Sequence, residues 1–327
     1  ADLILGYIDP DYFHGGKMKL YRELAYHAIK DKVADPLGID VSEAARLIKK
    51  VVDANMGDII VKETYLRGFD PRDFILFAAG GAGPTHCCGY GFYSKLYKIV
   101  IFPFSATFCA LGSAGMDIVH IYERSKKLLL LKPEGKGYFE DYEDYNEVVE
   151  SLQHQALRDI RGEGFSLEGL IFRLELEMKF GGQVHVLRAN SPHLRIDKLE
   201  DVRAICESFY NEFSDVYGSA AMFPEGGVEI RNFILHSILP QHKIELPTYP
   251  MAGEKVSKEA SKGERMAYWE GNGGFRITPV LDQNKLNPGN RIDGPAIIEC
   301  KDTNLVLEPG SKVTVDKYLN LTIEKIL

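Results

Sequence analysis

The sequence has no cluster of basic residues and no long apolar run. Its 327 residues contain 39 Lys and Arg against 47 Asp and Glu, which gives a formal net charge of −8. A chain without a basic patch is not expected to bind nucleic acid. No stretch approaches the roughly 18 apolar residues of a membrane span, and no basic segment precedes the apolar residues Ala1–Leu5. Neither a membrane span nor a signal peptide is therefore expected.

Cysteine is scarce and irregularly spaced. The cysteines are odd in number and match no zinc-binding spacing: Cys87, Cys88, Cys109, Cys206 and Cys300. This pattern predicts reduced, mostly buried thiols in a cytoplasmic protein, and no metal site. The remaining composition, with 45% hydrophobic and 26% charged residues, is typical of a globular protein long enough for two or three domains.

Two common nucleotide-binding motifs are also missing. No Gly-Lys-Ser/Thr follows the glycine-rich segment Gly80–Pro84, and His86 stands where the last glycine of Gly-x-Gly-x-x-Gly would be. The apolar run before this segment, Phe74–Ala79, predicts a buried strand, and helix-compatible residues follow it. Glycine lets backbone N–H groups approach a ligand, and a helix N-terminus offers unpaired N–H groups to phosphate or ribose oxygens. The turn therefore predicts a nucleotide site, with tight packing as the alternative.

Helices and strands alternate around this glycine turn. Apolar periodicity predicts a helix over Lys17–Lys32 and a second helix that begins after Asp40, with Ser42 as a candidate cap, and runs to about Tyr65. Lys98–Pro103 is typical of a second strand, so these elements indicate an α/β layer. The sequence opens with a short apolar piece and an elaborate loop. Its first element is therefore expected to pack on something outside the chain.

The middle of the chain has amphipathic patterns with the period of a helix in some segments and the period of a strand in others. They predict a helix through residues 142–160, a strand at Ile171–Phe180, a hairpin at Gly181–Gly182 with a partner strand at 185–189, a helix at Leu199–Tyr217 and a strand at Val228–Leu239. A polar loop and short strands separated by Gly, Pro and Asn follow. The sequence thus predicts an α/β lobe over residues 1–130, an α+β domain over 131–246 and a β-rich module over 247–327.

Seven motifs occur in order along the chain. They are Ala1–Gly16, Asp53–Met56, Arg67–Phe74, Gly80–Pro84 with His86, Lys179–Gln183, Phe213–Gly218 and Gly294–Glu299. Together they resemble the A-type subunits of the hydantoinase/oxoprolinase family. The resemblance implies a fold similar to the sugar-kinase, actin and heat-shock ATPases, which bind ATP between two ribonuclease-H-like lobes.

One part of that fold has no counterpart in this sequence. The first lobe of those ATPases carries an Asp-x-Gly-Gly-Thr phosphate loop, and the sequence contains no such motif. The chain therefore resembles only the C-terminal half of the family's usual chain. By this resemblance, Gly80–Gly83 would form the nucleoside side of the ATP cleft.

The resemblance implies an activity that this chain cannot perform alone. Phosphoryl transfer needs clamped phosphates and a positioned Mg²⁺, so a partner subunit is expected to supply the phosphate-binding lobe and to hold most of the Mg²⁺. Within the family, a split A-type chain is similar to the multi-subunit ATP-dependent carboxylases of aromatic ketones such as acetophenone. That similarity implies activation of bicarbonate, of the ketone enolate or of both by phosphorylation. A subunit of a hydantoin- or 5-oxoproline-type cyclic amidase and a non-catalytic scaffold are the alternatives.

The candidate site is the glycine turn and the start of the helix after it. The residues expected to contact ATP are Gly80, Gly81, Ala82, Gly83, Thr85 and His86. For His86 alone, a packed or capping role is the favoured alternative. The sequence assigns no catalytic residue, since no Ser-His-Asp or Cys-His arrangement follows from spacing.

Other polar residues have a structural explanation that is favoured over a functional one. Solvated helix faces explain Asn55, Asp58, Lys17 and Lys19, a turn explains Asp9, Asp11 and His14, and a hairpin explains Gln183 and His185. For the turn, the alternative is a Mg²⁺ site, although such sites usually include water and phosphate ligands.

Overall fold

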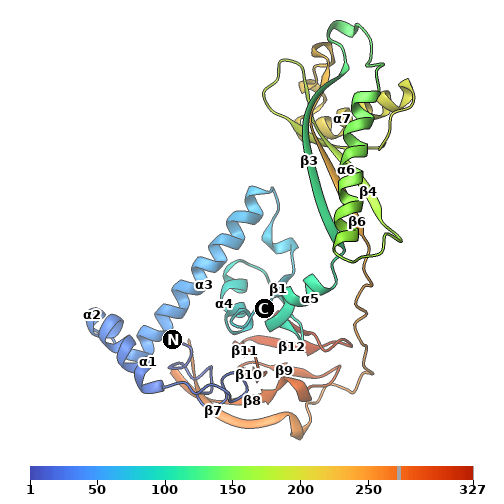
Figure 1. Cartoon of the computed structure of the whole chain (residues 1–327). Helices are drawn as coiled ribbons and strands as arrows, with labels where there is room; N and C mark the ends of the chain where they lie inside the picture. Colours follow the sequence, from blue (N-terminus) through green and yellow to red (C-terminus); the bar gives the residue numbers. More distant parts are fainter. Residues whose placement is uncertain (271–273, 327) are drawn as a thin grey trace. The chain divides into compact units, whose positions relative to one another are not determined.

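The computed structural model describes residues 1–270 and 274–326 (Figure 1). It has two compact units: unit 1 is Ala1–Ala114 with Glu245–Leu327, and unit 2 is Gly115–Ile244. The helices are α1 (Arg22–Ile29), α2 (Asp35–Leu37), α3 (Val41–Leu66), α4 (Gly83–Tyr93), α5 (Phe108–Ala114), α6 (Glu143–Gly162) and α7 (Leu199–Tyr217). The strands are β1 (Leu76–Ala78), β2 (Lys98–Ile101), β3 (Ile118–Leu131), β4 (Ile171–Phe180), β5 (Leu187–Ser191), β6 (Val228–Leu239), β7 (Ser261–Trp269), β8 (Gly274–Asp282), β9 (Arg291–Asp293), β10 (Ala296–Glu299), β11 (Asn304–Leu307), β12 (Ser311–Val315) and β13 (Leu321–Lys325).

Unit 1 contains two sheets. One has the strand order β1-β2-β13-β12-β9, and the other has the order β11-β10-β8-β7. β1 and β2 are parallel and are joined through α4, whereas β13 runs antiparallel to β2. The strands expected to form a C-terminal module over 247–327 therefore share a sheet with β1 and β2. Pairing between segments so far apart in the chain leaves no local pattern in the sequence. Residues 271–273 and Leu327 of the expected module lie outside the described residues.

The long helix α3 begins at Val41, directly after Asp40 as predicted, but its N-cap differs from the prediction. The side chain of Asp40 accepts hydrogen bonds from the backbone N–H of Ser42 (2.8 Å) and Glu43 (3.0 Å). The N-cap of α3 is thus Asp40, and the prediction of Ser42 is wrong, because Asp40 has the extended backbone that a cap requires. The helix expected over Lys17–Lys32 is shorter and starts at Arg22, and it continues into a π-helical turn at Lys30–Ala34.

β1 is shorter and more exposed than its apolar sequence predicts. Only Leu76–Ala78 form the strand, and the side chain of Phe77 is 59% exposed while Ala78 is buried. The prediction of a buried strand over Phe74–Ala79 is therefore wrong. The physical reason is that β1 is the edge strand of its sheet and pairs only with β2.

Unit 2 is a two-layer α+β structure that follows its sequence pattern closely. Its antiparallel sheet has the order β3-β6-β4-β5, and α6 and α7 cover one face. β4, β6 and α7 have the predicted bounds, and the predicted hairpin leads into β5. The apolar residues of β4 alternate inward because side chains point to opposite faces along a strand. The long strand β3 was not predicted and runs to residue 131, where the α+β domain was expected to begin.

Most of the cysteines are buried, as the sequence predicts. All five cysteines are free, and Cys87, Cys88 and Cys206 are buried whereas Cys109 is exposed. Burial raises the pKa of the Cys206 thiol to about 12. Among the described residues, no helix combines the length and the apolar character that crossing a membrane requires.

Candidate functional site

The glycine turn is held in place on both sides by hydrogen bonds to distant backbone and side-chain atoms. Gly80 has a φ of +86°, which favours glycine, and its N–H donates to the carbonyl oxygen of Ser105 at 2.7 Å. The carbonyl oxygen of Gly81 accepts a hydrogen bond from the Thr303 hydroxyl at 2.8 Å. The turn is therefore a fixed feature of unit 1 that ends at Gly83, the first residue of α4.

The glycines of this turn are not required by close packing. A Cβ added to Gly80 would meet no atom within 4 Å, and one added to Gly81 would lie 3.6 Å from the carbonyl oxygen of Asp302, an ordinary contact. At Gly83 the nearest atom would be 3.8 Å away. The tight-packing explanation of the motif is thus not supported by these contacts, because the space beside the turn is open.

A cavity of about 380 Å³ lies beside Gly81. Three segments line it, from the N-terminal loop, from the glycine turn with the start of α4, and from the connection between β10 and β11: Ile8, Asp9, Tyr12, Phe13, His14, Met18, Gly81, Thr85, Glu299, Cys300, Lys301, Asp302, Thr303 and Asn304. Of the six residues expected to contact ATP, the cavity wall includes Gly81 and Thr85. The Thr85 hydroxyl donates to the carbonyl oxygen of Asn304 at 2.9 Å and so joins two of the walls.

The N-terminal loop contributes polar and aromatic groups to this cavity. Asp9 accepts a hydrogen bond from the backbone N–H of Asp11 at 2.9 Å, which is a side-chain-stabilised turn. His14 lies 3.3 Å from a carboxylate oxygen of Asp302. Within residues 1–270 and 274–326, no group of three or more His, Cys, Asp or Glu is arranged to hold a metal ion. Asp9 and Asp11 thus form a local turn, whereas His14 contacts the connection between β10 and β11.

His86 is not on the wall of the cavity but in a buried ionic cluster. Its Nδ1 lies 2.6 Å from a carboxylate oxygen of Asp53, and its Nε2 lies 3.4 Å from one of Asp2. Burial by itself would lower the pKa of His86, but the hydrogen bonds and charges of Asp2 and Asp53 outweigh it and raise the pKa to about 9. His86 is therefore an imidazolium at neutral pH, and it ties α4 to α3 and to the N-terminal segment.

Lys49 extends the same cluster along α3. Its Nζ lies 2.5 Å from the second carboxylate oxygen of Asp53, one helical turn away. Burial opposes the charge on Lys49, but Asp53 raises the pKa above the ordinary value. The sequence analysis missed Asp2 and Lys49. Asp2 and Asp53 lie in two of the motifs, and Lys49 is one helical turn before Asp53, but no role was predicted for Asp2 or Lys49.

A second buried carboxylate, that of Glu299, lies on the wall of the cavity. Glu299, at the end of β10, is 2% exposed and is paired with Lys262 and Arg265 of β7. The ammonium group of Lys262 also lies over the ring of Tyr12, 3.3 Å from its centroid. Glu299 therefore fixes the cations that hold the N-terminal loop against the cavity. It belongs to a motif of the sequence analysis, but no role for it was predicted.

The remaining polar candidates lie away from the cavity. Asn55 and Asp58 are exposed on α3, as expected, and Asp58 accepts a hydrogen bond from the Tyr93 hydroxyl at 2.9 Å. Lys17 and Lys19 are also exposed, and Lys19 lies 3.7 Å from Asp11. Gln183 and His185 belong to unit 2 and line an apolar groove there, together with residues of α7.

Comparison with known proteins agrees with the motifs. Residues 1–122 match the hydantoinase/oxoprolinase family, and residues 137–326 match the hydantoinase/oxoprolinase C-terminal domain. The acetophenone carboxylase gamma subunit of Aromatoleum aromaticum is 40% identical over 326 residues, which is 100% of this chain and 44% of that protein. The caprolactamase subunit alpha of Pseudomonas jessenii is 30% identical over 320 residues, 97% of this chain and 44% of that protein.

A solved structure of acetone carboxylase, nucleotide-free and described in connection with ATP-dependent acetone carboxylation, has a similar fold. The TM-score is 0.86 at 27% identity, and the match covers 99% of this chain and 46% of that one. The chain thus spans a little under half the length of each of these three relatives. The family matches cover nearly all of the sequence and both units. The chain therefore belongs to the hydantoinase/oxoprolinase family.

Proposed function

We propose that this chain is a subunit of a multi-subunit ATP-dependent ketone carboxylase and supplies the nucleoside half of its ATP site. The observation that carries the proposal is the cavity beside Gly81 and Thr85, in a chain 40% identical to an acetophenone carboxylase gamma subunit. By this proposal the chain is half of an actin-like, ribonuclease-H-like ATPase fold. A partner subunit completes the cleft with a phosphate-binding lobe.

The residues beside the glycine turn suit a nucleoside more than a triphosphate. The open space at Gly81 and the rings of Tyr12 and Phe13 are suited to a ribose and a flat base. Gly80, Ala82 and Gly83 would shape the turn, and α4 would direct its N-terminal N–H groups toward the ligand.

Mg²⁺ would be held mainly by the partner, because the described part of the chain has no cluster of metal-binding side chains. When bound, ATP would supply the phosphoryl group that activates bicarbonate or a ketone enolate. The role of this chain is to bind and orient the nucleoside and to shield it from water.

A direct test uses the glycine whose side-chain position points into the cavity. Gly81→Val should lower the affinity for an ATP analogue by about tenfold or more, since its branched side chain would occupy the ligand's space. Gly112→Val is the matched control, because a Cβ at this exposed position on α5 meets no atom within 4 Å. Affinity would be measured by calorimetry on the complex that co-purifies with the chain and on the chain alone. Equal affinity of the Gly81→Val complex and the unmodified complex would exclude this cavity as the ATP site.

The cyclic amidase is a second candidate, favoured by the 30% identity to a caprolactamase subunit alpha. It would use the same ATP half-site for activation of an amide. ATP hydrolysis by the complex, measured with acetophenone plus bicarbonate and separately with caprolactam or 5-oxoproline, separates the two functions. If the complex neither binds nor hydrolyses nucleotide, the function of this chain is that of a non-catalytic scaffold.

A further inference from the structure

β1 lies at the edge of a sheet, although its sequence is that of a central strand. The segment Phe74–Ala79 is apolar at every position, a pattern typical of parallel strands that are covered on both faces. β1 is indeed parallel to β2, yet β2 is its only strand partner among the described residues. The other edge of β1 is therefore free, and it presents backbone N–H and C=O groups with which a further strand would pair.

Large apolar side chains are exposed along this free edge. The exposed fractions are 45% for Phe74, 50% for Ile75 and 59% for Phe77, whereas Ala78 is buried in the core of unit 1. Because side chains alternate along a strand, Ile75 and Phe77 lie on the face of the sheet opposite to Ala78. No charged side chain interrupts the segment, although charged residues are a common means by which proteins keep edge strands from pairing.

The ring of Phe77 also belongs to an aromatic cluster. It packs edge-on against Phe102, with 5.1 Å between the ring centroids, and Phe102 is stacked with Phe108 at 4.7 Å and with Phe104 at 5.9 Å. These three rings are half-buried. Packed rings present a firm apolar surface to a partner. We call the free edge of β1, with Ile75, Phe77 and these three rings, the β1 edge surface.

Other edge strands of the molecule have their backbone groups bonded outside their own sheets. At β5, the N–H of Asn190 donates to Glu212 at 2.8 Å, and its carbonyl oxygen accepts from the Ser208 hydroxyl at 2.7 Å. At β9, the N–H of Arg291 donates to the carbonyl oxygen of Glu254 at 2.8 Å. These edges are closed by atoms of the same chain.

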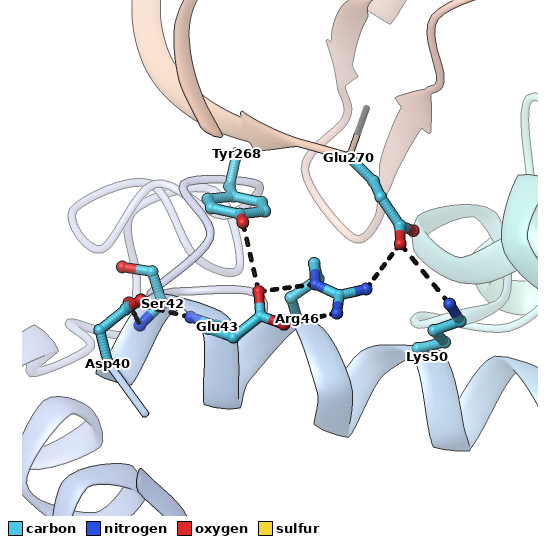
Figure 2. A network of polar contacts seen from close by, with 7 residues as sticks. All are labelled: Asp40, Ser42, Glu43, Arg46, Lys50, Tyr268 and Glu270. Atoms are coloured by element: carbon cyan, nitrogen blue, oxygen red, sulfur yellow. Dashed lines mark hydrogen bonds and ion pairs between the residues drawn. The ribbon is translucent and has the colours of Figure 1, made fainter. Parts of the chain in front are cut away.

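The edge strand β7 is closed in the same way. The N–H of Tyr268 donates to the carbonyl oxygen of Leu5 at 2.9 Å. Figure 2 shows that the start of α3 covers the end of this strand: Arg46 donates to Glu43 at 2.8 Å and to Glu270 at 2.7 Å, and the Tyr268 hydroxyl lies 3.4 Å from Glu43. In the described part of the chain, by contrast, no backbone group of Leu76–Ala78 has a hydrogen bond outside its sheet.

The β1 edge surface is suited to one kind of partner. Free backbone groups along a strand are best satisfied by another extended segment, and the exposed rings favour apolar side chains on that segment. The matched part is 44%, 44% and 46% of the three relatives named above, so more than half of each lies outside it. The partner subunit of the proposed function corresponds to that outside part.

We propose that an extended apolar segment of the partner subunit pairs with the free edge of β1 and adds a strand to this sheet. Its side chains pack on Ile75, Phe77 and the aromatic cluster. The inference rests on the proposed function for the existence of the partner, and it assigns the surface on which the partner docks. Three residues separate Ala78 from Gly81, a span of at most about 10 Å. The added strand therefore brings the partner close to the glycine turn, and β1 becomes the central strand that its sequence predicts.

The first test is amide hydrogen exchange, measured by mass spectrometry on the full chain alone and in the complex that co-purifies with it. The amides of residues 75–79 that face the free edge should exchange at least about tenfold more slowly in the complex, because they become donors to the added strand. The amides of β5 are the internal control, since its edge is already bonded to α7 in the chain alone. Co-purification without protection at β1 does not support the proposal.

The second test changes the side chain at the centre of the surface. Phe77→Asp should raise the dissociation constant of the complex by about tenfold or more, because it buries an unpaired charge in an apolar contact. Sedimentation of a dilution series would measure it. Ile277→Asp is the matched control, because Ile277 is a 68% exposed strand residue of β8 in the same unit, outside the β1 edge surface. If Phe77→Asp does not fold, the exchange experiment decides, since it uses the unmodified chain.

Four results would overturn the proposal: no partner co-purifies, the β1 amides exchange equally with and without the partner, the Phe77→Asp and Ile277→Asp complexes have equal dissociation constants, or the chain alone forms a dimer in which β1 is already protected. The last result would make a second copy of the chain the occupant. ATP-analogue binding to the same complex keeps the two proposals separate. Protection of β1 without nucleotide binding refutes the ATP site alone, and nucleotide binding without protection refutes the added strand alone.

Discussion

Unit 1 and unit 2 both have apolar cores, but their buried charges are arranged differently. The core of unit 2 is built from apolar and aromatic residues, such as Phe180, Phe209 and Phe233, between one sheet and two helices. Unit 1 has apolar clusters as well and buries the charged groups of Lys49, Asp53 and Glu299, whereas the buried carboxylates of unit 2 are Asp201 and Glu229. Buried charges cost free energy unless they are paired, so they contribute less to stability than apolar packing does. By the proposed function the ATP site lies in unit 1, so loss of a buried side chain is expected to have different consequences in the two units.

The largest effect should follow from breaking the cluster that joins α3 to α4. Asp53→Ala would leave Lys49 and His86 buried without their shared carboxylate, at a cost of roughly 3–5 kcal/mol in the unfolding free energy of unit 1. Native-state hydrogen exchange of the α4 amides would measure the loss. By the proposed function, the affinity for an ATP analogue should fall as well, because α4 carries Thr85.

The matched variant in unit 2 is Phe209→Ala, which removes a ring that is 0% exposed. It should cost a similar 3–5 kcal/mol, measured at the α7 amides, because a cavity replaces the ring. Nucleotide affinity should not change in the fraction that stays folded. Equal loss of affinity in both variants would contradict the division of roles between the units.

A smaller effect should depend on pH. The pKa of His86 is raised from 6.5 to about 9 in the folded chain. Its stabilisation is therefore complete below pH 6.5 and is lost as the pH rises toward 9, because the unfolded chain releases the proton first. The unfolding free energy from urea titrations at several pH values should fall across this range. His86→Asn should reduce this dependence of the unfolding free energy on pH, whereas His154→Asn, on an exposed part of α6, should not.

The smallest effect should come from an exposed ion pair. Glu150 of α6 lies 2.5 Å from Arg195, but the two side chains are 52% and 59% exposed. Glu150→Gln should change the unfolding free energy by less than about 1 kcal/mol, since water and salt screen such pairs. Urea denaturation would measure it. A loss as large as that of Asp53→Ala would mean that burial does not explain the difference between the two ion pairs.

Much of the fold could be predicted where the pattern is local. β4, β6 and α7 have the predicted bounds, because an amphipathic strand or helix reveals its buried face within a few residues. The sharing of one sheet by β1, β2 and β13 could not be predicted, since strand pairing across the chain has no local signature. The same reasoning explains the site. Gly81 and Thr85 were predicted from the glycine motif, whereas Tyr12 and Thr303, which also line the cavity, belong to segments far from that motif in the sequence.

The sequence by itself determined the family, the glycine turn and most of the helices and strands of unit 2. It did so because glycine conformation and hydrophobic period are properties of neighbouring residues. Only the tertiary structure decided that His86 lies in an ionic cluster and that Glu299 holds Lys262 and Arg265. The energies of buried charges depend on which groups surround them, and folding brings those groups together from separate parts of the chain.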